Sequence, residues 1–149
     1  ASGVVFHAKQ LRSGSAFALK EVNIARMRPK VDPELLWREV KILQQLCWPS
    51  IVPLYDAWMA SGKFLYMLTP ALESSVAAAL QSALKTGTPI KAQRVAEWYS
   101  QVLHATGYLH WSGVLHRDIK VENLVLAMGG RQLKICDFGS AALLDEAGG

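Results

Sequence analysis

The stretch of residues 116–139 reads HRDIKVENLVLAMGGRQLKICDFG, and it holds two polar clusters separated by short apolar runs. The first cluster is residues 116–123 and the second is residues 137–139. Between them, the apolar run 124–126 and the mainly apolar run 133–136 flank the pair Gly129-Gly130. Two short apolar runs joined by glycines predict a β-hairpin. The sequence therefore predicts one polar loop before this hairpin and a second directly after it.

The side chains in these loops suit phosphoryl transfer. That reaction needs positioning and charge neutralisation rather than a covalent intermediate. Asp118 is suited to accept the proton of an incoming hydroxyl, while oxygen donors from Asn123 and Asp137 fit Mg²⁺. Lys20, on a separate predicted strand, supplies a cation for phosphate groups. The four residues form a set suited to binding and transferring a phosphoryl group.

Composition narrows the class of protein. The chain has 149 residues, of which 51% are hydrophobic and 19% charged, which is enough for one domain with a core. The net charge of +4 comes from scattered basic residues, so we expect no nucleic-acid partner. The two cysteines lack metal-site or disulfide-framework spacing, which favours a reducing, intracellular location in the cytoplasm. No apolar run approaches the roughly 18 residues of a membrane span.

The residues upstream of Pro70 predict strands around one helix. Residues 4–6 and 17–22 predict a first hairpin with a turn at 12–15, and residues 51–58 and 64–69 predict a second. Asp32-Pro33 is typical of a helix start, and we expect a helix over residues 33–46. Beyond Pro70 the pattern becomes helical. A long helix ending near Gly113 is predicted, with a core face made of Val95, Trp98, Tyr99, Val102, Thr106 and Leu109.

Taken together, these motifs resemble the signature of eukaryotic protein kinase domains of the Ser/Thr type. Ala18-Leu19-Lys20, the catalytic-loop sequence 116–123 and Asp137-Phe138-Gly139 occur in the family's order. Glu39 follows Lys20 by 19 residues, where the family has its ion-pair glutamate. One tripeptide would be a weak signal, but four ordered elements are specific. The resemblance covers the chain from Gly3, which resembles the last glycine of the Gly-rich loop, through Gly139.

The resemblance implies an α+β, two-lobed fold. Residues 1–72 would form the N-lobe and hinge, an antiparallel sheet with one helix, and residues 73–149 the start of a mainly helical C-lobe. The first two glycines of the Gly-rich loop and the activation segment have no counterpart in the sequence. We therefore expect a partial, truncated kinase domain.

The resemblance also implies a role for each site residue, with ATP and Mg²⁺ as cofactors. Asp118 would be the catalytic base, and Lys120 would contact the transferring phosphate. Lys20 would hold the α- and β-phosphates with Glu39 as its partner; the simpler interpretation is an unrelated surface Lys and Glu. Asn123 and Asp137 would bind metal. The nucleotide-binding residues would be Gly3, Val5, Ala18, Lys20, Thr69, Leu72 and Val125.

The implied function is a serine/threonine protein kinase that transfers the γ-phosphate of ATP to a Ser or Thr hydroxyl of a protein substrate. Lys120 favours Ser/Thr over Tyr acceptors. The alternative is a catalytically inactive kinase-like fragment or pseudokinase that acts as a nucleotide- or protein-binding module. The intact set of Lys20, Glu39, Asp118, Asn123 and Asp137 favours the enzyme, whereas the missing ends favour the alternative. The catalytic loop is also similar to that of the Numb-associated kinases, and the sequence leaves the subfamily open.

Overall fold

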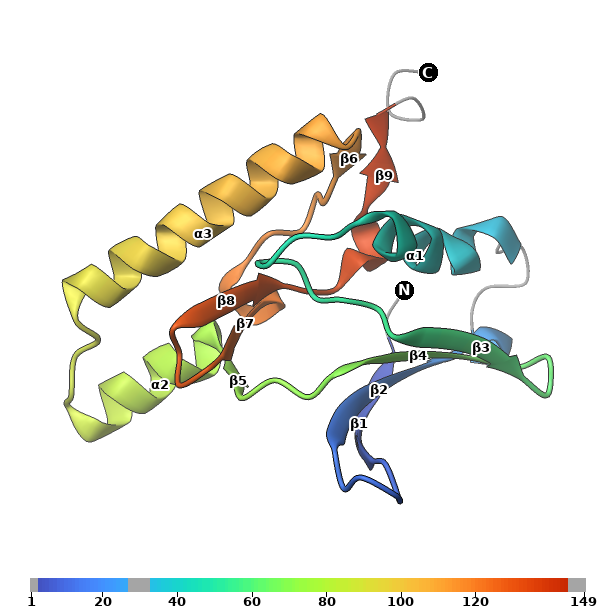
Figure 1. Ribbon diagram of the computed structural model, residues 1–149, viewed down its shortest axis with the longest axis horizontal. Coiled ribbons are helices and arrows are strands. Elements are labelled where there is room, and N and C mark those ends of the chain that lie inside the picture. The colour runs from blue at the N-terminus through green and yellow to red at the C-terminus, as the bar shows by residue number, and fades with distance from the viewer. Residues whose placement is uncertain (1–2, 27–32, 145–149) are drawn as a thin grey trace.

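The computed structural model describes residues 3–26 and 33–144 (Figure 1). Its N-terminal part is an antiparallel sheet of four strands in the order β1-β2-β4-β3. These strands are β1 (Val4–Lys9), β2 (Ala16–Asn23), β3 (Asp56–Ala60) and β4 (Phe64–Pro70). A short 3₁₀ turn, η1 (Ile24–Arg26), follows β2, and the helix α1 (Pro33–Gln45) follows later in the chain.

One face of this sheet packs against α1 because the strand residues alternate. The register pairs Val22 with Leu65 and Lys20 with Met67, so these four side chains share a face. Val22, Leu65 and Met67 are buried together with Val40 of α1. Burying each such side chain contributes about 1.5–3 kcal/mol. Lys20 therefore lies on the helix-facing side of the sheet.

The C-terminal part is helical with short strand pairs. It contains two α-helices, α2 (Val76–Thr86) and α3 (Ala92–Trp111), which lie away from the four-stranded sheet in Figure 1. The strands β5 (Ser74–Ser75), β7 (Leu124–Ala127) and β8 (Gln132–Ile135) form a second sheet. A third pairing joins β6 (Val114–Leu115) to β9 (Ala142–Leu143). The first polar cluster ends in the 3₁₀ turn η2 (Val121–Asn123), and Asp137 of the second directly precedes the 3₁₀ turn η3 (Phe138–Ser140).

The two parts share a core. Ile42 and Leu43 of α1, and Leu46 directly after it, belong to the same buried cluster as Leu133 and Ile135 of β8. The backbone joins them as well, because Val52 N donates to Ile135 O at 3.0 Å and Ile135 N donates to Ser50 O at 2.9 Å. Phe138 of η3 also lies in this cluster. The loop carrying Asp137 is thus attached directly to the packing of α1.

The fold class is as predicted: an α+β fold whose N-terminal part is an antiparallel sheet with one helix. The helix predicted over residues 33–46 is α1, and Asp32 lies outside the described residues. The run 51–58 becomes a strand only from Asp56, because Ile51 forms a bridge with Ile135 of β8. Helix α2 was not predicted as a separate element; the Oγ of Ser75 caps it by accepting a hydrogen bond from Ala78 N.

The predicted core face of the long helix is partly wrong. Val95 and Tyr99 are exposed, while the buried residues of α3 are Trp98, Ala105 and Leu109. The buried stripe is turned toward β8 and the loop before it, where Trp98 Nε1 donates to Gly130 O at 2.8 Å. Across the described ranges 3–26 and 33–144, none of the helices combines the length and apolar character needed to cross a bilayer.

Candidate active site

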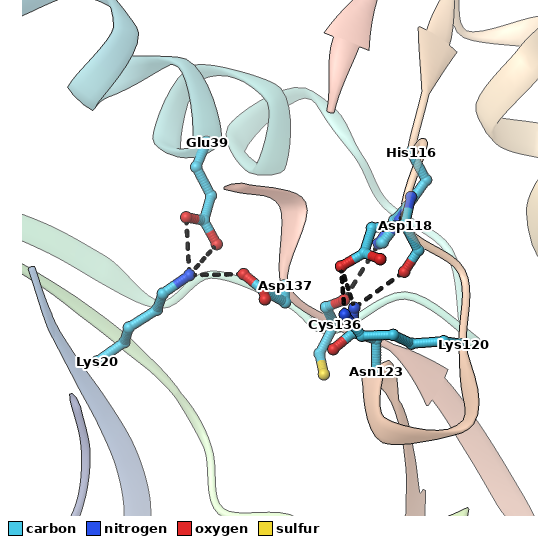
Figure 2. Close-up of polar contacts among 8 residues, drawn as sticks. All are labelled: Lys20, Glu39, His116, Asp118, Lys120, Asn123, Cys136 and Asp137. Atoms are coloured by element: carbon cyan, nitrogen blue, oxygen red, sulfur yellow. Dashed lines mark hydrogen bonds and ion pairs between the residues drawn. The ribbon is translucent and has the colours of Figure 1, made fainter. Parts of the chain in front are cut away.

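Lys20 lies at the centre of a group of three charged residues. Its Nζ donates to both carboxylate oxygens of Glu39, at 2.8 and 2.9 Å, and to Oδ1 of Asp137 at 2.8 Å (Figure 2). The three residues come from β2, α1 and the loop after β8, so the site depends on the packing that joins the two parts. The Lys20–Glu39 contact was predicted from sequence, whereas the direct contact with Asp137 was not.

Lys20 and Asp137 favour each other's charged forms. Burial alone would lower the pKa of Lys20, but the carboxylates of Glu39 and Asp137 outweigh it and the pKa is raised. Burial also works to raise the pKa of Asp137, yet the hydrogen bond and charge of Lys20 outweigh it and the pKa is lowered. Neutralisation by opposite charges is what makes burial of such groups tolerable.

A second cluster lies in the loop before β7. Lys120 Nζ donates to Asp118 Oδ2 at 2.8 Å, and Asn123 Nδ2 donates to the same oxygen at 3.0 Å and to Asp118 O at 2.9 Å (Figure 2). The hydrogen bond from Lys120 is the main reason why the pKa of Asp118 is lowered. The carboxylate is therefore ionised and held in one orientation by two donors.

His116 connects this loop to the segment of Asp137. Its Nδ1 accepts a hydrogen bond from Asp118 N at 3.3 Å, so the ring proton lies on Nε2 and is donated to Cys136 O at 3.1 Å. Burial lowers the pKa of His116, which keeps the ring neutral. The ring also meets Phe138 edge-on, with centroids 4.7 Å apart. His116 is thus a structural link between the two polar clusters.

Arg117 makes a further link between the same loops. It has a φ of 65°, in the left-handed region, and its Nε donates to Ser140 O at 2.6 Å. The φ of Asp137 is 60°. Left-handed backbone at a non-glycine residue costs of order 1 kcal/mol and is typical of functional loops. Both polar clusters therefore contain a residue in an uncommon backbone conformation.

A cavity of about 530 Å³ lies between the sheet and the β7–β8 hairpin. Such a volume is in the range of small-molecule and cofactor sites. Every residue predicted to bind nucleotide lines it, from Gly3, Val5, Ala18 and Lys20 to Thr69, Leu72 and Val125. A Cβ at Gly3 would lie 2.5 Å from Glu21 O, so only glycine fits at that position.

Several lining residues were not predicted from sequence. They include Leu43, Val52 and Met67, which meet the cavity near Glu39, and also His7. Strand alternation offered a signal for Met67, since it shares a face with Thr69, two residues away. No comparable local signal marks Leu43 or Val52, because α1 and an irregular segment bring them there. Cys136 lines the cavity as well, and burial raises the pKa of its thiol to about 11.

The cavity also contains donors that fit a magnesium ion. Asn123 and Asp137 both line it. The hydrogen bonds from Asn123 to Asp118 use Asn123 Nδ2, which leaves the Asn123 Oδ1 out of these contacts. The hydrogen bond from Lys20 to Asp137 uses Asp137 Oδ1 and not Oδ2. Within the described part of the chain, no cluster of three or more His, Cys, Asp or Glu residues forms an all-protein metal site. Mg²⁺ is usually bound by only one or two protein oxygen ligands together with the phosphates of the substrate.

Comparison with known proteins agrees with this geometry. Residues 1–148 match the family model described as protein kinase domain. The chain is 34% identical over 148 residues to mitogen-activated protein kinase HOG1A of Wallemia ichthyophaga, covering 97% of this chain and 38% of the relative. It is 32% identical over 148 residues to mitogen-activated protein kinase Hog1 of Zymoseptoria tritici, covering 97% and 39%.

A plant relative shows a similar match. CBL-interacting serine/threonine-protein kinase 15 of Arabidopsis thaliana is 31% identical over 142 residues, which covers 95% of this chain and 32% of the relative. The chain thus spans about two fifths or less of the length of these three relatives. The match over nearly the whole chain, together with the Lys20–Glu39 pair and the two polar clusters, shows that the chain belongs to the protein kinase domain family.

Proposed function

We propose that the protein containing this chain is a serine/threonine protein kinase that transfers the γ-phosphate of ATP to a Ser or Thr hydroxyl of a protein substrate. The observation that carries the proposal is the ionised carboxylate of Asp118, oriented by Lys120 and Asn123 in a loop that His116 ties to the segment of Asp137. The names of the relatives, mitogen-activated and serine/threonine-protein kinases, support the same acceptor type.

Different residues of the cavity bind different parts of ATP. Lys20, held by Glu39 on α1, faces the α- and β-phosphates, and the apolar side chains of Val5, Ala18, Leu72 and Val125 enclose the adenine ring. Asn123 and Asp137 would hold Mg²⁺, which would neutralise charge on the phosphates.

Asp118 accepts the proton of the incoming hydroxyl. Its lowered pKa means that the carboxylate is available as a base throughout the neutral range. Lys120, 2.8 Å from Asp118 Oδ2, places a positive charge beside the phosphoryl group in transfer. The hydroxyl gives its proton to Asp118 as its oxygen bonds to the γ-phosphorus, the bond from that phosphorus to the β-phosphate oxygen breaks, and ADP leaves. Lys120 balances charge on the phosphoryl oxygens during transfer.

The domain division and the location belong to the same proposal. Residues 1–72 serve as the N-lobe and hinge, and residues 73–149 as the first part of the C-lobe. This division is supported by the change from the four-stranded sheet to the helices after Pro70. The free thiols of Cys47 and Cys136 support an intracellular, cytoplasmic protein.

A second candidate function is a kinase-like module that binds a partner protein without catalysis. The observation that favours it is a row of exposed apolar side chains along α3, formed by Val95, Tyr99 and Leu103. Exposed apolar surface of this kind is common at protein–protein contacts. The intact polar clusters favour the enzyme over this candidate.

Transfer of labelled phosphate distinguishes the two candidates. The full-length protein is incubated with γ-³²P-labelled ATP, Mg²⁺ and a mixed protein substrate, and the product is hydrolysed to free amino acids. We expect labelled phosphoserine or phosphothreonine, and none with a Lys20→Met variant. Labelled phosphotyrosine alone would refute the Ser/Thr assignment, and ATP binding without any transfer would favour the binding module.

A further inference from the structure

Glu73 binds the turn between β7 and β8 through both its backbone and its side chain. Its N donates to Leu126 O at 2.9 Å. Its carboxylate accepts from Gly129 N at 2.8 Å, through Oε1, and from Gly130 N at 3.2 Å, through Oε2. No part of the family motif predicts this clamp, since Glu73 lies between the cavity residue Leu72 and strand β5.

The turn is shaped to receive a carboxylate. Met128, Gly129 and Gly130 have φ angles of 56°, 67° and 73°, so three successive residues are left-handed. Successive backbone N–H groups in such a turn form a concave site for anions, and glycine makes this conformation accessible. A carboxylate that accepts two backbone N–H groups makes charge-assisted hydrogen bonds, which are stronger than neutral ones. Glu73 is the anion that fills this site.

Side chains of α3 hold the turn by hydrogen bonds. Trp98 Nε1 of α3 donates to Gly130 O at 2.8 Å, and Gln101 Nε2 donates to Arg131 O at 3.1 Å. Gln101 Oε1 also accepts from Leu133 N at 2.8 Å. Two side chains of α3 therefore hold the turn to which Glu73 binds.

Glu73 thereby joins two walls of the cavity. Thr69, Pro70, Ala71 and Leu72 line the cavity on the segment that leaves β4, which we call the hinge. Val125 lines it from β7, directly before Leu126, to which Glu73 N is bonded. The spacing between the hinge and Val125 is the space available to a flat ring. A clamp one residue beyond the hinge sets this spacing without touching the ring.

We propose that Glu73 is a positioning residue for nucleotide binding, which acts by fixing the hinge to the β7–β8 turn. The inference rests on the proposed binding of ATP in this cavity. Glu73 contacts no reacting group, so its loss weakens binding of the adenine end and leaves the chemical step unchanged. Coupling between two sites is reciprocal, so bound nucleotide also stabilises the contact between Glu73 and the turn.

The first test separates KM from kcat in the full-length protein. For Glu73→Ala we expect the KM for ATP to rise by about three- to tenfold, the range of a lost charge-assisted contact near the surface, with kcat unchanged. Glu73→Gln keeps one acceptor oxygen, so we expect its KM for ATP to lie between those of the wild-type protein and Glu73→Ala. The matched control is Glu97→Ala, which removes a half-buried glutamate that pairs with Arg94 on α3. A KM for Glu73→Ala equal to that of Glu97→Ala would overturn the inference.

The second test needs no variant. Hydrogen exchange at the amides of Gly129 and Gly130 is measured in the wild-type protein with and without a non-hydrolysable ATP analogue. We expect the analogue to slow exchange at both amides, although neither residue lines the cavity. If the analogue binds but exchange at the two amides is unchanged, the role proposed for Glu73 is overturned and the proposed function is not. Failure of the wild-type protein to bind the analogue at all would instead refute the proposed function.

Discussion

At the scale of single residues, the ionised state of Asp118 depends on Lys120. The ammonium of Lys120 lies 2.8 Å from Asp118 Oδ2, and its hydrogen bond is the main cause of the lowered pKa of the carboxyl. Because the folded pKa lies below the ordinary value of 3.8, the interaction stabilises the fold above that pH. This contribution is lost as the pH falls through the folded pKa.

Replacement of Lys120 by Met should therefore raise the pKa of Asp118 toward 3.8. The charge and the strongest hydrogen bond to the carboxylate are removed, while the bond from Asn123 remains. The measurement is a titration of the Asp118 carboxyl carbon by ¹³C NMR. Lys63→Met, in the exposed turn before β4, is the control and should leave the titration unchanged. An unaltered midpoint in Lys120→Met would contradict the assigned cause.

The two cysteines should differ strongly in reactivity. Burial raises the pKa of the Cys136 thiol to about 11, so roughly one molecule in a thousand carries the reactive thiolate at pH 8. Cys47 is exposed. With iodoacetamide at pH 8, followed by peptide mass spectrometry, we expect rapid labelling of Cys47 and little labelling of Cys136. Equal rates at the two positions would contradict the buried environment of Cys136.

At the scale of elements, local patterns were sufficient where one face of an element is buried. Alternation in β2 and the glycine pair between β7 and β8 predicted those elements, and the start signal at Pro33 predicted α1. The buried face of α3 could not be predicted, because helical spacing allows more than one apolar stripe. In the structure, the face that carries Trp98 is buried against the β7–β8 turn, where Trp98 donates a hydrogen bond to Gly130 O.

The candidate site was predictable as a set of residues but only partly as a set of contacts. Lys20, Glu39, Asp118, Asn123 and Asp137 stand in motifs whose order is visible in the sequence. The contact between Lys20 and Asp137 joins residues 117 positions apart, and the clamp from Glu73 to Gly129 joins residues 56 positions apart. Such contacts depend on tertiary packing, which the spacing of residues along the sequence does not predict.

The packing of α1 can be tested through a buried residue that lies outside the cavity. Ile42 is 1% exposed and belongs to the core cluster shared by the two parts. Ile42→Ala should lower the free energy of unfolding by about 2–5 kcal/mol, because the lost side chain leaves a cavity. Gln45→Ala, at the exposed end of the same helix, should stay within about 0.5 kcal/mol. Urea unfolding measures both, and equal midpoints would contradict the shared core.

At the scale of the whole molecule, the two parts are held together by the core around α1 and β8, while α3 leaves apolar side chains uncovered. Tyr99 and Leu103 are 65% and 53% exposed on one side of α3. A chain of residues 1–149 expressed alone should therefore bind the dye ANS. Tyr99→Gln with Leu103→Gln should lower the fluorescence, whereas Glu97→Gln with Ser100→Gln should not. Absence of dye binding in the unsubstituted chain would contradict an open apolar face.

The role of Asp118 is the central claim, and one paired measurement on Asp118→Asn in the full-length protein tests it. The substitution preserves size but removes the base, and Asp118 does not line the cavity. We predict that phosphate transfer falls by at least about 100-fold, the usual loss for a general base, while the affinity for ATP stays unchanged. Transfer at near wild-type rates would contradict the account, as would a loss of ATP affinity large enough to explain the loss of transfer.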